Sequence, residues 1–391
     1  MSSLSLILRH RRYFAPVWLF ASLNIIIGTW VLYIPDVKAR LGLSDGELGL
    51  AIFCFSGGLL SIIPASSWLL DRFGLGRLSF WSIVALALLM CLPVIAPSYL
   101  LLCVALFACG VAASLLDIGM NAMVSELEQE DEVHFMSAAH GFFSLGGVLG
   151  AGIGSLLIGR LPEAVYQPLL AAGVVIVTNA LLAASYYGRR SRKADRGEEG
   201  KFKLSLLRPL LGLAVLCVLI MGSEGAIEHW SKLYLLDVVA VDSDRLAGLG
   251  FVLFSTTMMI GRFLGDNISD RFGSLTIIIG GSLIGATGFG LVLTTELWPA
   301  MAGFGLVGIG YSVIIPELFR LAGQTRGVSP AEGISVVAGV GYAGFLASPA
   351  LLGFLSDLSS LRLSFGALFV AAVVAAVIGT SLHRRRRPQR I

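Results

Sequence analysis

The chain has 391 residues, of which 56% are hydrophobic and only 14% are charged. Soluble domains are typically about 45–50% apolar and about 25% charged, so this chain has too little charge to cover a water-exposed surface. Its formal net charge of +3 is too small to indicate nucleic-acid binding. The composition excludes a soluble enzyme, a disordered chain and a fibrous protein, and it indicates a protein of the lipid bilayer.

The N-terminal region indicates a retained first membrane span. A basic cluster at 9–12 precedes an apolar stretch that begins near Phe14 and continues to about Ile34. A cleaved signal peptide has a core of only about 7–15 apolar residues followed by a small-residue cleavage site. The stretch is too long for that, so we expect it to stay in the protein as a helix.

Twelve stretches are long enough to cross a bilayer, which takes about 20 mainly apolar residues. They are continuous apolar blocks, whereas the strands of a membrane barrel alternate between apolar and polar residues. We therefore predict an all-α membrane protein with 12 transmembrane helices. The predicted spans are 14–35, 46–69, 77–97, 99–124, 135–160, 165–187, 208–236, 246–268, 274–295, 297–322, 332–356 and 362–382.

The distribution of Lys and Arg predicts the orientation of the chain in a plasma (inner) membrane. With both termini in the cytoplasm, that side holds the cluster at 9–12, Arg72, Arg77 and the run at 384–387. Cytoplasmic loops carry such an excess of basic residues. The segment Glu126–Glu132 breaks the trend because it is acidic and contains no Lys or Arg, but acidic residues have little effect on orientation.

The two halves of the chain repeat one another. A charged segment at 189–207 divides the chain into six spans plus six, which predicts an N-terminal bundle at 1–188, a cytoplasmic linker and a C-terminal bundle at 208–391. Parallel six-helix repeats are a known transporter arrangement in which substrate binds at their interface. The tetrapeptide DRFG occurs at 71–74 and again at 270–273, and the pair Phe-Ser occurs at 55–56 and 254–255, each repeated after 199 residues.

The loops that carry DRFG resemble the signature of the major facilitator superfamily. The first copy has Ser67 where the signature usually begins with Gly, and the second copy contains Gly265 and Asp266 in this region. The resemblance implies two pseudo-symmetric six-helix bundles, and it implies that charges pair across the cytoplasmic ends of neighbouring helices to form a gate. The predicted gate residues are Asp71, Arg72, Arg77, Arg262, Asp266, Asp270 and Arg271.

Within that superfamily, residues 116–121 of the fourth span resemble the sugar–proton symporters typified by fucose permease. Those symporters have an acid at the position of Asp117, and the resemblance implies that it carries the coupling proton. They have a second acid in the first span, four residues before the proline of an Ile-Pro pair. Here Ile34 and Pro35 are present, but the aligned residue is Val31. Any coupling would therefore depend on Asp117 without that partner.

Ionisable residues inside a span are costly and are therefore candidates for function. Asp117 and His140 are at similar depths in consecutive spans, so they can form a pair that takes up and releases protons near neutral pH. In the alternative interpretation, Asp117 hydrogen-bonds Asn121 or a neighbouring helix and holds the bundle together.

The seventh span contains two acids, Glu224 and Glu228, which share one helix face because they are four residues apart. We expect Glu224 to contact substrate or proton from the C-terminal half. For Glu228 a place in a solvated outer rim with His229 and Lys232 is an equal alternative.

Polar and aromatic residues in the spans complete the predicted substrate site. Tryptophan rings pack on sugar rings and amides bind their hydroxyls, although tryptophan also belongs to the interfacial belt of membrane proteins. The predicted substrate-binding residues are Asn24, Trp30, Asn121, Glu224, Glu228, Trp230 and Tyr311.

Motifs for other classes of protein are missing from the sequence. No nucleotide-binding GxxxxGK[ST], no HExxH and no GxSxG occurs, and the five cysteines have neither disulfide nor zinc spacing. We therefore expect no enzyme, no metal site and no cofactor, with the proton as coupling ion. The predicted function is proton-coupled symport of a small polar organic solute, a sugar or sugar derivative, by a monomer in the bilayer. The alternatives are drug or metabolite efflux by proton antiport, and a non-transporting membrane sensor or scaffold.

Overall fold

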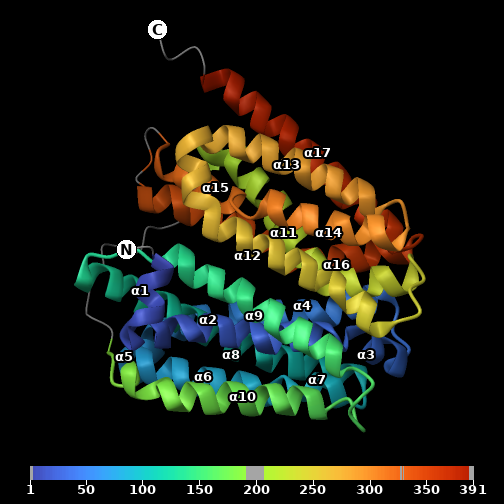
Figure 1. The fold of residues 1–391 in the computed structure, drawn as a ribbon, viewed down its shortest axis with the longest axis horizontal. Helices are drawn as coiled ribbons and strands as arrows, with labels where there is room; N and C mark the ends of the chain where they lie inside the picture. Colours follow the sequence, from blue (N-terminus) through green and yellow to red (C-terminus); the bar gives the residue numbers. More distant parts are fainter. Residues whose placement is uncertain (1–2, 191–206, 326–327, 329, 387–391) are drawn as a thin grey trace. The chain divides into compact units, whose positions relative to one another are not determined.

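The computed structural model describes residues 3–190, 207–325, 328 and 330–386, and all regular structure in these residues is helical (Figure 1). Twelve helical stretches of the described chain are long and apolar enough to cross a membrane, which confirms the predicted number. They are Arg11–Val31, Asp45–Ser66, Leu75–Ile95, Tyr99–Asp131, Ala138–Leu157, Tyr166–Ser185, Arg208–Asp237, Asp244–Gly265, Ser274–Val292, Leu297–Gly323, Glu332–Asp357 and Leu361–Arg384.

The chain divides into two compact units: residues 1–193 with 243–252, and residues 194–242 with 253–391. Most of the predicted linker at 189–207 lies outside the described residues. The helices up to residue 190 are α1 (Ser3–Arg9), α2 (Arg11–Val31), α3 (Ile34–Leu41), α4 (Asp45–Ser61), α5 (Ile63–Phe73), α6 (Leu75–Leu89), α7 (Cys91–Ile95), α8 (Tyr99–Asp131), α9 (Met136–Leu157) and α10 (Tyr166–Leu182), followed by the 3₁₀ turn η1 (Ala183–Ser185). The later helices are α11 (Leu207–Asp237), α12 (Asp244–Phe272), α13 (Ser274–Val292), α14 (Leu297–Tyr311), α15 (Ile314–Gly323), α16 (Pro330–Asp357) and α17 (Leu361–Arg386).

Prolines mark two of the points at which one helix ends and the next begins. Pro35 lies in the first turn of α3 and Pro64 in the first turn of α5, where the missing N–H of proline costs no helical hydrogen bond. Helix α3 is a further addition to the prediction, because the stretch after Pro35 reads as a polar loop. It ends at Gly42, whose φ of 63° is left-handed, and Lys38 forms a 2.6 Å ion pair with Asp45 at the start of α4.

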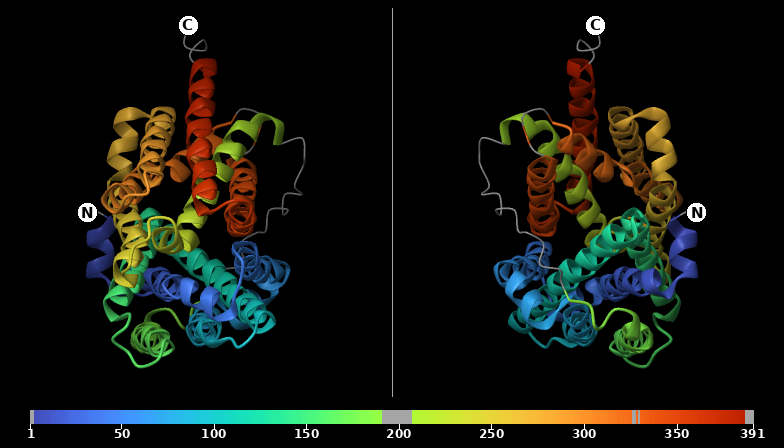
Figure 2. Two further views of the ribbon diagram at one scale, coloured as in Figure 1. Left: turned by 90° about the vertical axis from the view of Figure 1, so that its right-hand side faces the viewer. Right: turned by 90° about the vertical axis from the view of Figure 1, so that its left-hand side faces the viewer.

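The order in which helices pack is the same in the two units. The first spanning helix packs mainly on the fifth (α2 on α9, α11 on α16), and the third packs on the fourth and sixth (α6 on α8 and α10, α13 on α14 and α17). Figures 1 and 2 show α6 and α10 side by side along one edge of the first unit. The repeated order is physical support for the predicted pseudo-symmetry.

The repeated Phe-Ser pair marks an equivalent helix contact in each unit. Gly110 of α8 lies so close to α4 that an added Cβ would be 2.0 Å from the carbonyl oxygen of Phe55. Gly308 of α14 meets α12 in the same way, 2.3 Å from the carbonyl oxygen of Phe254. Small residues allow helix backbones to approach closely in a membrane, so the second and fourth spans of both units are joined through glycine.

The two DRFG segments also have equivalent backbone structures. Each glycine ends one helix and begins the next, with φ 84° and ψ 155° at Gly74, and φ 76° and ψ 152° at Gly273. Residues with a side chain rarely adopt this combination, which explains glycine in both copies. The preceding arginines also match, because Arg72 lies over the ring of Phe73 and Arg271 over the ring of Phe272.

The acidic segment that departs from the charge pattern, Glu126–Glu132, is neutralised within its own unit. The Nη2 group of Arg12 lies 2.8 Å from Glu130, and its Nε lies 3.0 Å from Asp131. Arg189, after the sixth span, also contacts Glu130 at 3.0 Å. Glu128 accepts a 2.7 Å hydrogen bond from the backbone N–H of Met136 at the start of α9. The carboxylates thus join the ends of α2, α8 and α9 to the chain after η1.

Candidate functional site

Glycines on α11 determine which face of this helix packs on α16 and which face carries its acidic residues. Gly222 and Gly225 face α16, where an added Cβ would lie 3.4 Å from the carbonyl oxygen of Gly344 and 3.0 Å from the ring of Phe345. Because this face is filled by α16, Glu224 and Glu228 lie on a neighbouring face, one turn apart. Both acidic residues are partly buried and lie within the seventh span.

Arg262 of α12 forms an ion pair with Glu224 inside the spans. Its Nη2 group lies 3.7 Å from Oε2 of Glu224, and the two side chains are 20% and 15% exposed. Arg262 was predicted as a gate residue at the cytoplasmic ends of the helices. Gly261 and Gly265 bring α12 against the junction of α14 and α15 and leave Arg262 able to reach α11, and its role at the gate stays a prediction.

Polar atoms around this ion pair lack partners. The Oε1 atom of Glu224 is buried and accepts no hydrogen bond from the described residues. Tyr311 of α14 is 1% exposed and lies beside Ser223 and Glu224, and its hydroxyl makes no hydrogen bond of good geometry. Glu228 has neither a hydrogen bond nor a cation among the described side chains, and its charged neighbour is Glu224. Helices α11, α12 and α14 therefore gather two carboxylates, one guanidinium and one phenol.

In the first unit Asp117 and Asn121 form a pair on α8. The amide of Asn121 donates to the carboxylate of Asp117 at 3.1 Å and to its backbone carbonyl at 2.8 Å. This hydrogen bond is the one expected in the alternative interpretation, in which Asp117 bonds Asn121 and holds the bundle together. Within the described residues the carboxylate has no cation as a partner. Gly119 faces Ser79 of α6, where a Cβ would lie 2.2 Å from the hydroxyl oxygen, so close packing against α6 holds this part of α8.

The predicted pair of Asp117 with His140 is not formed in the described residues. His140 lies against Phe20 of α2 instead, with ring centroids 5.3 Å apart. The reason is the close contact of α9 with α2 through Gly146 and Gly150, which directs His140 toward α2. A role for His140 in proton transfer stays a prediction.

Asn24 also joins α2 to α9. Its amide donates to the carbonyl oxygen of Phe143 at 2.9 Å, while its own Oδ1 is buried without a partner in the part of the chain that the structure describes. The amide nitrogen of Asn24 therefore holds the two helices together, and its amide oxygen is an acceptor for a ligand.

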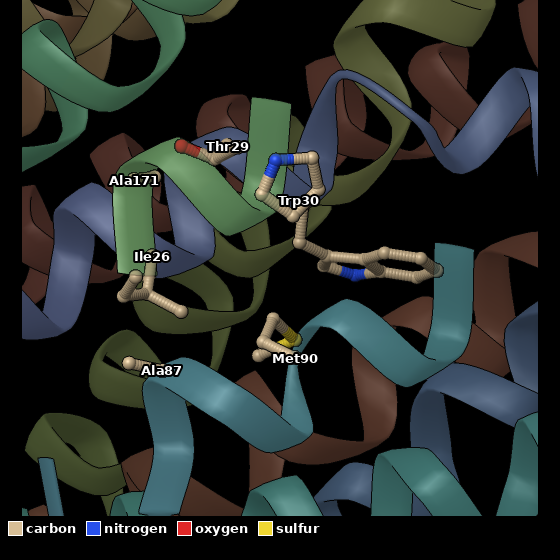
Figure 3. A pocket seen from close by; sticks show the side chains of 7 residues that line it. Ile26, Thr29, Trp30, Ala87, Met90 and Ala171 are labelled. Atoms are coloured by element: carbon tan, nitrogen blue, oxygen red, sulfur yellow. The ribbon is translucent and has the colours of Figure 1, made fainter. Parts of the chain in front are cut away.

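The two tryptophans of the predicted substrate site, Trp30 and Trp230, are both buried. Trp30 is 3% exposed and borders a narrow gap against α6 and α10 that is too small to admit a water molecule (Figure 3). The other side chains around this gap are mostly apolar, so it is a packing defect rather than a site for a sugar. Trp230 is fully buried, and its indole N–H has no partner among the described residues.

The remaining gate residues are at the DRFG segments. Arg77 lies over the ring of Tyr187, and Arg72 over those of Trp68 and Phe73. Asp71 is exposed, whereas the side chains of Asp266 and Asp270 are not among those described. Arg72 and Arg77 thus have aromatic contacts at these segments, and the charge pairing of the gate stays a prediction. The described residues contain no group of His, Cys, Asp and Glu that could hold a metal ion.

Comparisons with known proteins agree with this architecture. The family model of the Major Facilitator Superfamily matches residues 17–326 and 242–391. An uncharacterised MFS-type transporter of Yersinia pestis is 30% identical over 361 residues, which cover 92% of each chain. The membrane protein MosC of Rhizobium meliloti is 29% identical over 373 residues, covering 94% of this chain and 89% of MosC.

Solved structures share the fold. The nucleoside transporter NupG, in a mutant form, has a TM-score of 0.77 at 10% identity and covers 95% of this chain and 99% of its own. A bacterial homologue of the human lysosomal transporter Spinster has a TM-score of 0.70 at 15% identity and covers 94% of this chain and 96% of its own.

Fold and comparisons together define an integral, multi-pass membrane transporter rather than an enzyme. The chain belongs to the major facilitator superfamily. The part of the site that sequence reasoning missed is the pairing of Arg262 with Glu224. Its signal was an arginine beside Gly261 inside a predicted span.

Proposed function

We propose that the chain is a proton-coupled symporter of a small polar organic solute, a sugar or sugar derivative, working as a monomer by alternating access. Its membrane is the plasma (inner) membrane, with both termini in the cytoplasm. The coupling proton binds Asp117, and the two halves both supply side chains to the substrate. The sugar preference is supported by the resemblance of residues 116–121 to sugar–proton symporters.

The observation that carries this proposal is that Asp117 lies inside a span without a cationic partner among the described residues. A carboxylate inside a span costs at least about 2.5 kcal/mol on insertion scales unless it is paired or protonated. Asp117 has a single amide donor and no cation among the described residues. One proton would neutralise it at little structural cost, since Asn121 can bond either the neutral or the ionised carboxyl group.

Asn24 and Asn121 supply amides in the first unit, and Glu224, Glu228 and Tyr311 supply acceptors and a hydroxyl in the second. Buried polar atoms without partners are costly, and Asn24 Oδ1 and Glu224 Oε1 are both of this kind. Polyhydroxy solutes offer the donors that such atoms need. We leave Trp30 and Trp230 out of the proposed contacts, because both are fully packed.

Proteoliposome uptake across a panel of sugars and metabolites, with and without an inward proton gradient, tests the proposal. We expect accumulation of a solute only with the gradient. In Asp117→Asn, gradient-driven accumulation should be lost while counterflow exchange of the same solute continues, because exchange needs no net proton movement. Asp242→Asn, which makes the same change at an exposed loop residue, is the matched control and should behave as the wild type.

Two results would contradict the proposal. Accumulation by Asp117→Asn equal to that of the wild type would show that Asp117 does not carry the proton. Proton uptake into the lumen as substrate leaves it would show antiport, the mechanism of an efflux protein. A chain that moves no member of the panel in either direction would favour the sensor or scaffold alternative.

A further inference from the structure

We propose that the cluster on α11, α12 and α14 binds a protonated amine, with Glu228 as its counter-ion, so that the transported solute carries an amino group. This inference rests on the proposed function and names its substrate class more closely. It concerns only Glu224, Glu228, Arg262 and Tyr311, all of the second unit.

The charges of the cluster do not balance. Arg262 is paired with Glu224, and Glu228 sits one turn further along α11 with no cation of its own in the described chain. Lys232 follows after one more turn of α11, where it is 1% exposed and has a contact of its own. Because carboxylates inside spans pair with a cation as a rule, the unpaired charge at Glu228 is a site for a cation from outside the chain.

The hydrogen-bonding atoms select the kind of cation. Glu224 Oε1 is buried and unused, and the hydroxyl of Tyr311 beside it, in a side chain that is 1% exposed, makes no good hydrogen bond. With the carboxylate of Glu228 these are three acceptors that lack donors. An ammonium group has three donors and no acceptor, so one such group can satisfy all three.

Other occupants fit less well. A single proton neutralises one carboxyl group and leaves the other acceptors without donors. A sugar hydroxyl supplies one donor and no charge. A metal ion requires a group of several ligands of the right type, which the described residues lack. The amine is therefore the ligand class that the charges and the donor count both favour.

Binding to matched ligand triplets tests the inference. Each triplet contains an amine, its hydroxyl parent and its N-acetyl derivative: glucosamine, glucose and N-acetylglucosamine, the galactose and mannose equivalents, and ethanolamine, ethylene glycol and N-acetylethanolamine. Thermal stabilisation of the detergent-purified full chain is measured against ligand concentration. The variants are Glu228→Gln and, as matched control, Glu296→Gln, an exposed residue before α14 in the same unit.

We expect at least one amine to stabilise the wild type and Glu296→Gln, with its parent and N-acetyl derivative far weaker. In Glu228→Gln the concentration needed should rise by at least about tenfold, since a charge-assisted contact is lost. Equal binding of the neutral members, equal binding by Glu228→Gln, or no binding by any amine would each overturn the inference.

The experiments distinguish a failure of the symport proposal from a failure of the amine site. Proton-driven accumulation of a neutral solute that depends on Asp117, without amine binding, would leave the symport proposal standing and overturn the amine site. Amine binding that depends on Glu228, in proteoliposomes that show no proton-coupled uptake, would support the amine site and overturn the symport proposal.

Discussion

The guanidinium of Arg262 on α12 lies 3.7 Å from the carboxylate of Glu224 on α11, within two membrane spans. Each group alone would be an uncompensated charge in a low-dielectric region, and together they neutralise one another. The pair adds Arg262 to the candidate ligand-binding residues.

A double-mutant cycle should show that these two residues are energetically coupled. We expect Glu224→Gln and Arg262→Met each to lower the free energy of unfolding in detergent by about 2 kcal/mol, because each leaves the other charge unpaired. The double variant should be no less stable than the worse single variant. Arg160→Met, at an exposed loop residue, is the control and should change stability little. Additive losses would show that no coupling exists.

Close contact of α4 with α8 should make Gly110 intolerant of a methyl group. An added Cβ would lie 2.0 Å from the carbonyl oxygen of Phe55, so Gly110→Ala must push the helices apart, at a cost of about 1–3 kcal/mol. Gly57→Ala is the matched control on α4, because its Cβ would meet only the ring of Phe107 at 3.7 Å. This variant should be neutral or slightly stabilising, since alanine favours a helix. Equal melting temperatures for the two variants would contradict the packing.

The two DRFG glycines should respond differently to alanine although their backbones match. Gly273→Ala has open space around its Cβ, so its cost is that of the positive φ alone, about 1–3 kcal/mol. Gly74→Ala pays the same cost and in addition places a Cβ 3.0 Å from the carbonyl oxygen of Arg189. Melting curves of the two variants should rank Gly74→Ala as the less stable. The reverse order would show that the contact with Arg189 carries no strain.

Much of the fold follows from the sequence, because the bilayer restricts the choices. Twenty apolar residues in a row permit little besides a spanning helix, and all twelve predicted spans are confirmed with ends displaced by a few residues. The break before Pro64 was missed, since proline in an apolar stretch is compatible with either a kinked helix or two helices.

The site was less predictable, because contacts between helices depend on rotation about each axis. Depth along a span can be counted, and it placed Asp117 and His140 at one level. Which way His140 points is determined by Gly146 and Gly150 against α2, a packing detail that residue counting does not contain. The same holds for Arg262, whose distance along α12 gave no indication of its partner.

The salt bridges of Arg12 place the acidic segment Glu126–Glu132 at the same end of the first unit as the N-terminus. If the termini are cytoplasmic, as we propose, Glu132→Cys should react with a membrane-impermeant maleimide in inside-out vesicles. Glu163→Cys, in the loop between α9 and α10, should react in right-side-out vesicles, because one span separates the two positions. Both variants are compared in a background in which the partly exposed Cys54 and Cys103 are replaced by serine. The opposite pattern of labelling would invert the chain in the membrane, and labelling of both positions from one side would contradict the span between them.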